Sequence, residues 1–156
     1  MDFVLWACRA VHLISVVVWL GGLIFLNAVW KPIVEHHDAT ATRLNLETVM
    51  RFQPFVWSSL WPLLVTGLLL MLLSPRFIWF DYSTWWTRLL ALKQVAFLAL
   101  AFFAWQLMKV SAQLEKTREG HSEEFAGWWL AYSKLVKRSI VAGSVALLSG
   151  AAMMVL

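Results

Sequence analysis

The stretch from His12 to Phe25, "HLISVVVWLGGLIF", places one imidazole in an otherwise apolar segment. At 100° per residue, His12 shares a helix face with Trp19 and Gly22. An imidazole can bind a metal ion or haem iron, move a proton, or simply form a hydrogen bond to a neighbouring helix. Glycine on the same face permits close approach of another helix or of a flat cofactor. The pattern predicts a polar site at His12, with Trp19 and Gly22 as the floor of a cavity.

Lys93, in "RLLALKQVAFLAL", is a second polar residue within an apolar segment. Counted along the helices, it lies at nearly the same depth as His12, so we expect the two residues to face one cavity. Two interpretations stay open for the ammonium group. It can extend to the lipid headgroups, or it can bind an acidic ligand group such as a haem propionate. All nine acidic residues fall in connections or at the N-terminus, so no acid within the spans is expected to pair with Lys93.

Three methionines lie near the outer ends of the second and fourth predicted spans: Met71, Met153 and Met154. Thioether sulfur together with imidazole suits Cu(I) or one axial position of a haem. Methionine also fills gaps in apolar cores, and this interpretation stays open for each of the three. The predicted metal ligands are therefore His12 with one or more of these methionines.

The elements that must position these residues are apolar helices. Of the 156 residues, 61% are hydrophobic and only 14% are charged, which is typical of a membrane protein and not of a soluble domain. Four runs approach or exceed the roughly 20 residues needed to cross a bilayer, at about 3–30, 52–74, 86–108 and 139–156. We expect one domain, 1–156, folded as an all-α integral membrane four-helix bundle. Helical extensions are expected at about 39–51 and 109–138.

The basic residues predict an orientation. Lys and Arg are concentrated between the first and second runs and between the third and fourth runs. The positive-inside rule places both of these segments in the cytoplasm, and both termini on the outer, periplasmic side of a bacterial inner membrane. The net charge of +4 follows from this bias and from attraction to anionic lipid. It gives no indication of nucleic-acid binding.

Three segments resemble successive helices of the CopD copper-resistance membrane family: "AVHLISVVVWLGGLIFL", "RFQPFVWSSLWPLLVTGLLLM" and "WWTRLLALKQVAFL". The chain also resembles the HemJ-type protoporphyrinogen oxidases, which show His, then Trp seven residues on, then Gly, and a Lys in a later helix. The resemblance covers about three of the four helices. It implies that His12, Trp19, Gly22 and Lys93 are the cofactor-binding positions.

Three functions follow as hypotheses. The first is a CopD-like protein that binds or transfers copper at the outer face of the membrane, and the Trp-Leu-Gly-Gly form ranks it slightly ahead. The second is a haem b-binding redox protein or HemJ-like porphyrinogen oxidase. The third is a small accessory subunit of a larger membrane respiratory complex. The sequence has no Ser/His/Asp constellation and no zinc motif, which weighs against a hydrolase. It favours a metal- or haem-binding protein over an independent enzyme.

Overall fold

The computed structural model describes residues 2–32, 39–75, 77, 83–117 and 123–155, and these residues form helices with short turns and no strand. The first helical rod consists of α1 (Asp2–Val16), the π-helical η1 (Val17–Gly21), α2 (Gly22–Phe25) and the π-helical η2 (Leu26–Trp30). Three long helices follow: α4 (Ala39–Leu72), α5 (Trp85–Lys116) and α6 (Glu123–Ala152). The predicted all-α four-helix membrane bundle is confirmed.

The outer surface of the bundle is apolar, as a lipid-facing surface must be. Four helices are long and apolar enough to span a membrane: Phe3–Trp30, Leu46–Leu72, Trp85–Lys116 and Glu123–Ala152. Large apolar side chains on their outward faces, such as Val17 and Val95, are more than 60% exposed. In water such a surface would be strongly unfavourable, whereas hydrocarbon solvates it. The chain is an integral membrane protein.

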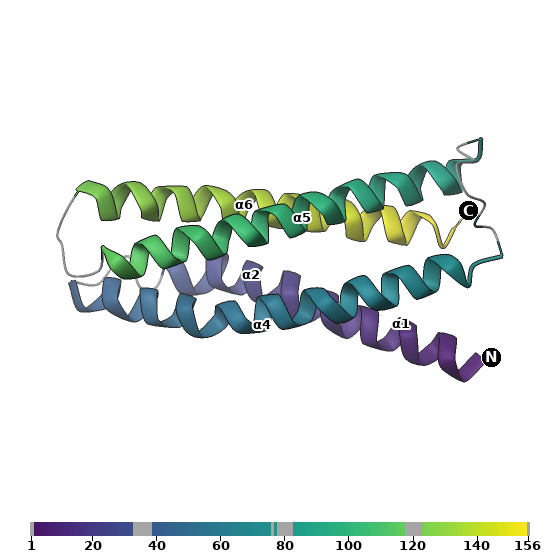
Figure 1. Cartoon of the computed structure of the whole chain (residues 1–156), viewed down its shortest axis with the longest axis horizontal. Coiled ribbons are helices and arrows are strands. Elements are labelled where there is room, and N and C mark those ends of the chain that lie inside the picture. Colours follow the sequence, from purple (N-terminus) through teal and green to yellow (C-terminus); the bar gives the residue numbers. More distant parts are fainter. Residues whose placement is uncertain (1, 33–38, 76, 78–82, 118–122, 156) are drawn as a thin grey trace.

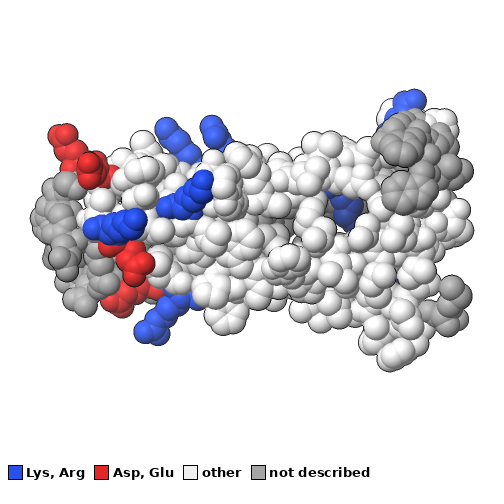
Figure 2. Space-filling view, viewed as in Figure 1, with Lys and Arg blue, Asp and Glu red and all other residues white. Residues whose placement is uncertain are grey.

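The four helices run antiparallel, so that both termini lie at one end of the bundle (Figure 1). We call this the terminal end. The opposite end, where α4 begins, α5 ends and α6 begins, carries most of the Lys, Arg, Asp and Glu side chains visible in Figure 2, and we call it the charged end. The α5 and α6 helices lie side by side along their length, and α1 lies beside α4.

The first rod changes its neighbours along its length. Its α1 part packs mainly against α4, and toward the N-terminus it diverges from α5 and α6 (Figure 1). The segments that follow, from η1 to η2, contact α6 as well. The main core cluster lies in this region, where Trp19, Leu20 and Leu23 meet Leu100 of α5 and Val136 of α6. The bundle is therefore closed in its middle and less tightly packed around α1 at the terminal end.

Candidate functional site

His12 lies on α1, half-buried against α4. Its Nδ1 is 2.9 Å from the hydroxyl of Thr66. The adjacent Gly67 provides the space for the ring, because a Cβ at that position would lie only 3.3 Å from His12 Cε1. The imidazole therefore lies against two adjacent residues of α4, the hydroxyl of Thr66 and the backbone of Gly67.

The hydrogen bonds around Thr66 determine which ring nitrogen carries the proton. The hydroxyl of Thr66 donates its single hydrogen to the carbonyl of Pro62, so toward His12 it acts as an acceptor. With that hydrogen on Pro62, the matching tautomer of His12 carries its proton on Nδ1, and the ring also forms a hydrogen bond with the backbone of Leu63. Nε2 is left with its lone pair. This is the form of histidine that binds a metal or haem iron, with the second nitrogen held by an outer partner.

Lys93 of α5 extends toward the same region from the other side of the bundle. Its Nζ lies against α6, where a Cβ on Gly150 would be 3.4 Å away. The side chain is half-buried, and its charge interacts electrostatically with His12. Figure 2 shows a basic side chain set in a hollow of the surface toward the terminal end. The structure thus brings the two polar residues that the sequence singled out to the same part of the bundle.

Trp19 lies two turns along the first rod from His12 and is only 3% exposed. Its ring packs on α6, where a Cβ on Gly143 would come within 2.6 Å of the indole. The indole N–H has no partner among the described residues. Trp19 closes the bundle on the core side of the His12 region, where the sequence predicted a cavity floor.

Gly22 differs from the expectation. The ring of Phe52, from α4, occupies the space beside it, and a Cβ at this position would collide with that ring. The expected room for a ligand at Gly22 is therefore taken by an aromatic side chain. Gly22 allows the first rod and α4 to approach closely. The polar groups of the candidate site lie on the N-terminal side of it, beside α1.

The three methionines are arranged differently from one another. The sulfur of Met71 accepts a hydrogen bond of 2.8 Å from the Gln94 side chain of α5. Met153 and Met154 lie in the turn after α6, where Met153 is half-buried and Met154 is 85% exposed. Within the described ranges, no group of three or more His, Cys, Asp or Glu side chains could hold a metal ion.

Thr66 and Gly67 are the site residues that sequence reasoning missed. The signal was present, because the Thr-Gly-Leu that ends the second segment of the CopD resemblance contains both. A threonine in a membrane helix usually bonds its own preceding carbonyl, so sequence alone gives no reason to connect it to His12. Gly150 belongs to a stripe of small residues on α6, which predicts close packing without naming the partner.

Comparison of the chain with protein families, with curated proteins and with solved structures finds no match. The geometry at His12 and Lys93 therefore carries the functional argument.

Proposed function

We propose that this chain is a membrane redox protein that binds haem b at the terminal end of the bundle. His12 would hold the haem iron through Nε2, and the ammonium of Lys93 would bind a propionate. The observation that carries the proposal is the Thr66–His12 hydrogen bond, since it orients the imidazole and favours the tautomer whose lone pair is on Nε2. Haem b would supply one-electron chemistry when bound.

The charge of Lys93 supports haem more than copper. A Cu(I) ion on Nε2 would be repelled by an ammonium group that already interacts with the same imidazole. A propionate would instead be attracted, and it would balance a lysine that no acid within the spans is expected to neutralise. Haem therefore ranks ahead of copper, the reverse of the order that the Trp-Leu-Gly-Gly form favours.

The packing of the first rod also supports a ligand at this end. Because α1 packs mainly against α4, it makes few contacts with α5 and α6. On the core side, Trp19 against Gly143 separates the region from the interior. The chain's own residues would therefore orient the imidazole, supply one positive charge and keep water from the core.

Copper handling is the second candidate. A neutral imidazole with its lone pair on Nε2 also suits Cu(I). Met153, in the turn after α6, follows Gly150 by three residues, so a half-buried thioether lies close in sequence to the Lys93 contact. The CopD resemblance supports the same candidate. In this case the methionine, and not the lysine, would be the residue on which ligand retention depends.

We further propose that the terminal end faces the outer, periplasmic side of a bacterial inner membrane. The support is the distribution of basic residues, since nine of the 13 Lys and Arg fall within 31–51 and 109–138, the stretches on either side of the two connections at the charged end. On this orientation the His12 region opens to the outer half of the bilayer.

The experiment is the absorption spectrum of the full chain purified from its native membrane. Haem b gives a Soret band that changes on reduction with dithionite, and His12→Ala should remove it. The control is His121→Ala, which changes a histidine in the connection between α5 and α6. A colourless protein with stoichiometric copper by elemental analysis would support the second candidate. If the protein carries neither ligand, both are wrong and the accessory-subunit hypothesis becomes first.

A further inference from the structure

Three basic side chains lie close together on α6 toward the charged end: Lys134, Lys137 and Arg138. All three are exposed, and their spacing along one helix places them about one turn apart. Figure 2, seen beside Figure 1, shows basic side chains projecting from the upper edge of the molecule, which α6 forms at this end. We call these three residues the basic cluster.

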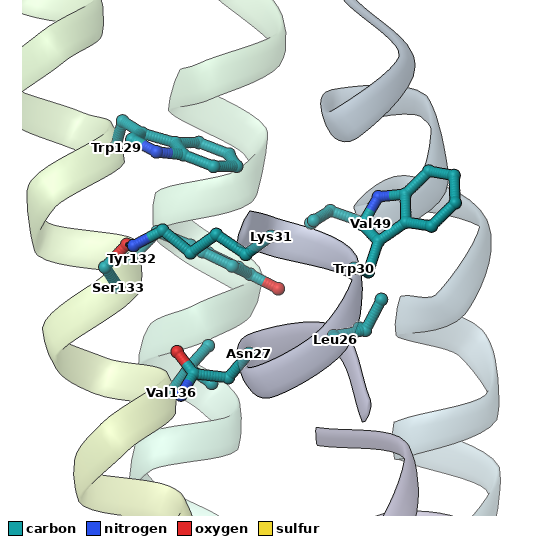
Figure 3. Close-up of a pocket in the computed structure, with 9 residues that line it drawn as sticks. All are labelled: Leu26, Asn27, Trp30, Lys31, Val49, Trp129, Tyr132, Ser133 and Val136. Carbon is teal, nitrogen blue, oxygen red and sulfur yellow. The ribbon is translucent and has the colours of Figure 1, made fainter. Parts of the chain in front are cut away.

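The opposite face of α6 at this level packs against the bundle. Ser133 and Val136 are buried, and both face the first rod in Figure 3. There, Lys31 Nζ donates a hydrogen bond of 2.8 Å to the hydroxyl of Ser133. At about 100° per residue, each member of the basic cluster is turned well away from these two buried positions. The basic cluster therefore faces the lipid side of α6 and lines no cavity of the bundle.

The lipid-facing side of α6 is apolar before and after the basic cluster. Leu130 lies one turn before Lys134 and is more than half exposed. Val141, one turn beyond Lys137, and Leu148 farther along the same face are also more than half exposed. Three cations are thus set in a strip that otherwise suits acyl chains, a position that is costly for a charge without an anionic partner.

No acidic residue is positioned on α6 to neutralise the basic cluster. The positions three and four residues from each of its members hold only apolar residues, a serine or another member of the cluster. The nearest acid on this helix is Glu124, which at 1.5 Å per residue is roughly 15 Å from Lys134 along the axis. On the adjacent α5 the only acid is Glu115, in the last turn. The cluster is therefore suited to an anion that approaches from the lipid.

The level of the basic cluster along α6 matches the edge of the hydrocarbon core. This core is about 30 Å thick, which corresponds to about 20 residues of helix. Counted back from Ala152, where α6 ends, that length reaches the residues just before the cluster. Lysine and arginine at such a boundary extend their charged groups to the phosphates, while their methylene groups stay against apolar neighbours.

We propose that the basic cluster binds a phospholipid that has two phosphates in its headgroup. Three cations within about one turn of helix exceed the charge of a single phosphate, whereas two linked phosphates bring two negative charges close together. The acyl chains would lie along the exposed apolar residues of α6. This site does not depend on haem or copper, because the His12 region lies at the opposite end of the bundle.

The test is native mass spectrometry of the full chain in detergent. The protein is titrated with diphosphatidylglycerol and, at equal phosphate concentration, with phosphatidylglycerol, which has one phosphate. The unaltered chain should retain diphosphatidylglycerol more strongly. Lys134→Gln/Arg138→Gln should weaken that retention about 25-fold, since each cation near an anionic lipid surface contributes about fivefold. Lys134→Arg/Lys137→Arg, which keeps the charges, should retain the lipid.

The matched control is Arg51→Gln/Lys116→Gln. It also removes one arginine and one lysine from exposed positions toward the charged end, but from α4 and α5, and it should leave retention unchanged. Circular dichroism checks that each variant is folded. If the double variant in the cluster is not folded, Lys137→Gln alone decides, with retention about fivefold weaker.

Three results would overturn the proposal. The first is unchanged retention of diphosphatidylglycerol by the folded cluster variant, and the second is an equal loss in the control. The third is equal retention of the two lipids by the unaltered chain, because it would mean that the basic residues attract anionic lipid in general and that no site for two phosphates exists.

Discussion

The two ends of the bundle each hold a polar side chain of the first rod by a hydroxyl on a neighbouring helix, but the neighbour differs. At the terminal end, His12 bonds to Thr66 of α4. At the charged end, Lys31 bonds to Ser133 of α6. Between them, Trp19 packs on α6 beside Gly143. The first rod thus moves from one neighbour to the other along its length, and its two polar anchors mark the two contacts.

The two anchors differ in the group to which the hydroxyl of Thr66 or Ser133 donates its hydrogen. Thr66 donates its hydrogen to Pro62, so it can only accept from His12, and the imidazole keeps a free lone pair. Ser133 accepts from Lys31 and keeps its hydrogen for a further acceptor. Under the proposed function, the terminal end would therefore present a base to the haem iron, whereas at the charged end the ammonium of Lys31 is bonded to Ser133. Similar hydroxyls produce opposite chemistry because their own hydrogens go to different places.

The largest effect expected is in the labelling of introduced cysteines from one side of the membrane, which should be all-or-none. In a Cys8→Ala background, Ser83→Cys at the terminal end should react with an impermeant thiol reagent added to intact cells, and Lys116→Cys at the charged end should not. Labelling is read as a mass shift on a gel. After the cells are opened, both variants should react, which controls for accessibility. The reverse pattern would place the His12 region on the cytoplasmic side.

The next effect concerns the contact between the two ends. Trp19→Ala should lower the free energy of unfolding by about 3–5 kcal/mol, because it leaves a cavity at a residue that is 3% exposed. Gly143→Leu should also destabilise strongly, since the indole occupies the space of its side chain. Denaturant titration in detergent measures both.

Gly127→Leu is the control for this pair, because a Cβ on Gly127 meets nothing within 4 Å. If Gly143→Leu and Gly127→Leu destabilise equally, the close contact of Trp19 with α6 is not what holds the first rod to that helix.

The sequence predicts the bundle and the polar pair for the same reason. Apolar length is a local property, so four spans can be read directly, and His12 and Lys93 stand out because imidazole and ammonium are costly in hydrocarbon. Their equal depth follows from counting residues along antiparallel helices. In the structure His12 lies beside Gly67 of α4 and Lys93 beside Gly150 of α6, and a cavity shared by the two stays a prediction.

The remaining features depend on which helix faces which, and this cannot be read from one segment. A glycine at position 22 could leave space for a ligand, but the ring of Phe52 from another helix fills that space. Met71 has the chemistry of a copper ligand, but Gln94 donates a hydrogen bond to its sulfur. Thr66 has no visible role until the structure places His12 beside it. In each case the deciding partner lies on another helix, more than 20 residues away in the chain.

A smaller effect is expected at the outer partner of the imidazole. Thr66→Val keeps the shape but removes the acceptor for His12 Nδ1–H, so the orientation of the ring is lost while the ligand atom remains. Loss of such a partner typically weakens metal or haem affinity about 10- to 100-fold. Titration of the ligand-free protein with haem measures it. Thr66→Ser, which restores the hydroxyl, should recover most of the affinity, and equal weakening in both variants would exclude a role for the hydrogen bond.

The smallest effect separates the two candidate ligands. Lys93→Met removes the charge beside His12 but keeps an unbranched apolar side chain in the space next to Gly150. A half-buried ion pair with a propionate contributes up to about 1 kcal/mol, so haem affinity should fall about two- to fivefold. Cu(I) affinity should instead be unchanged or higher, since the repulsive ammonium is gone. Lys109→Met, at the exposed charged end, should change neither. Parallel titrations with haem and with Cu(I) measure the two affinities. If Lys93 acts on the ligand through its charge, Lys93→Met lowers the haem affinity and does not lower the Cu(I) affinity. Equal changes in both affinities would mean that the lysine acts only through packing.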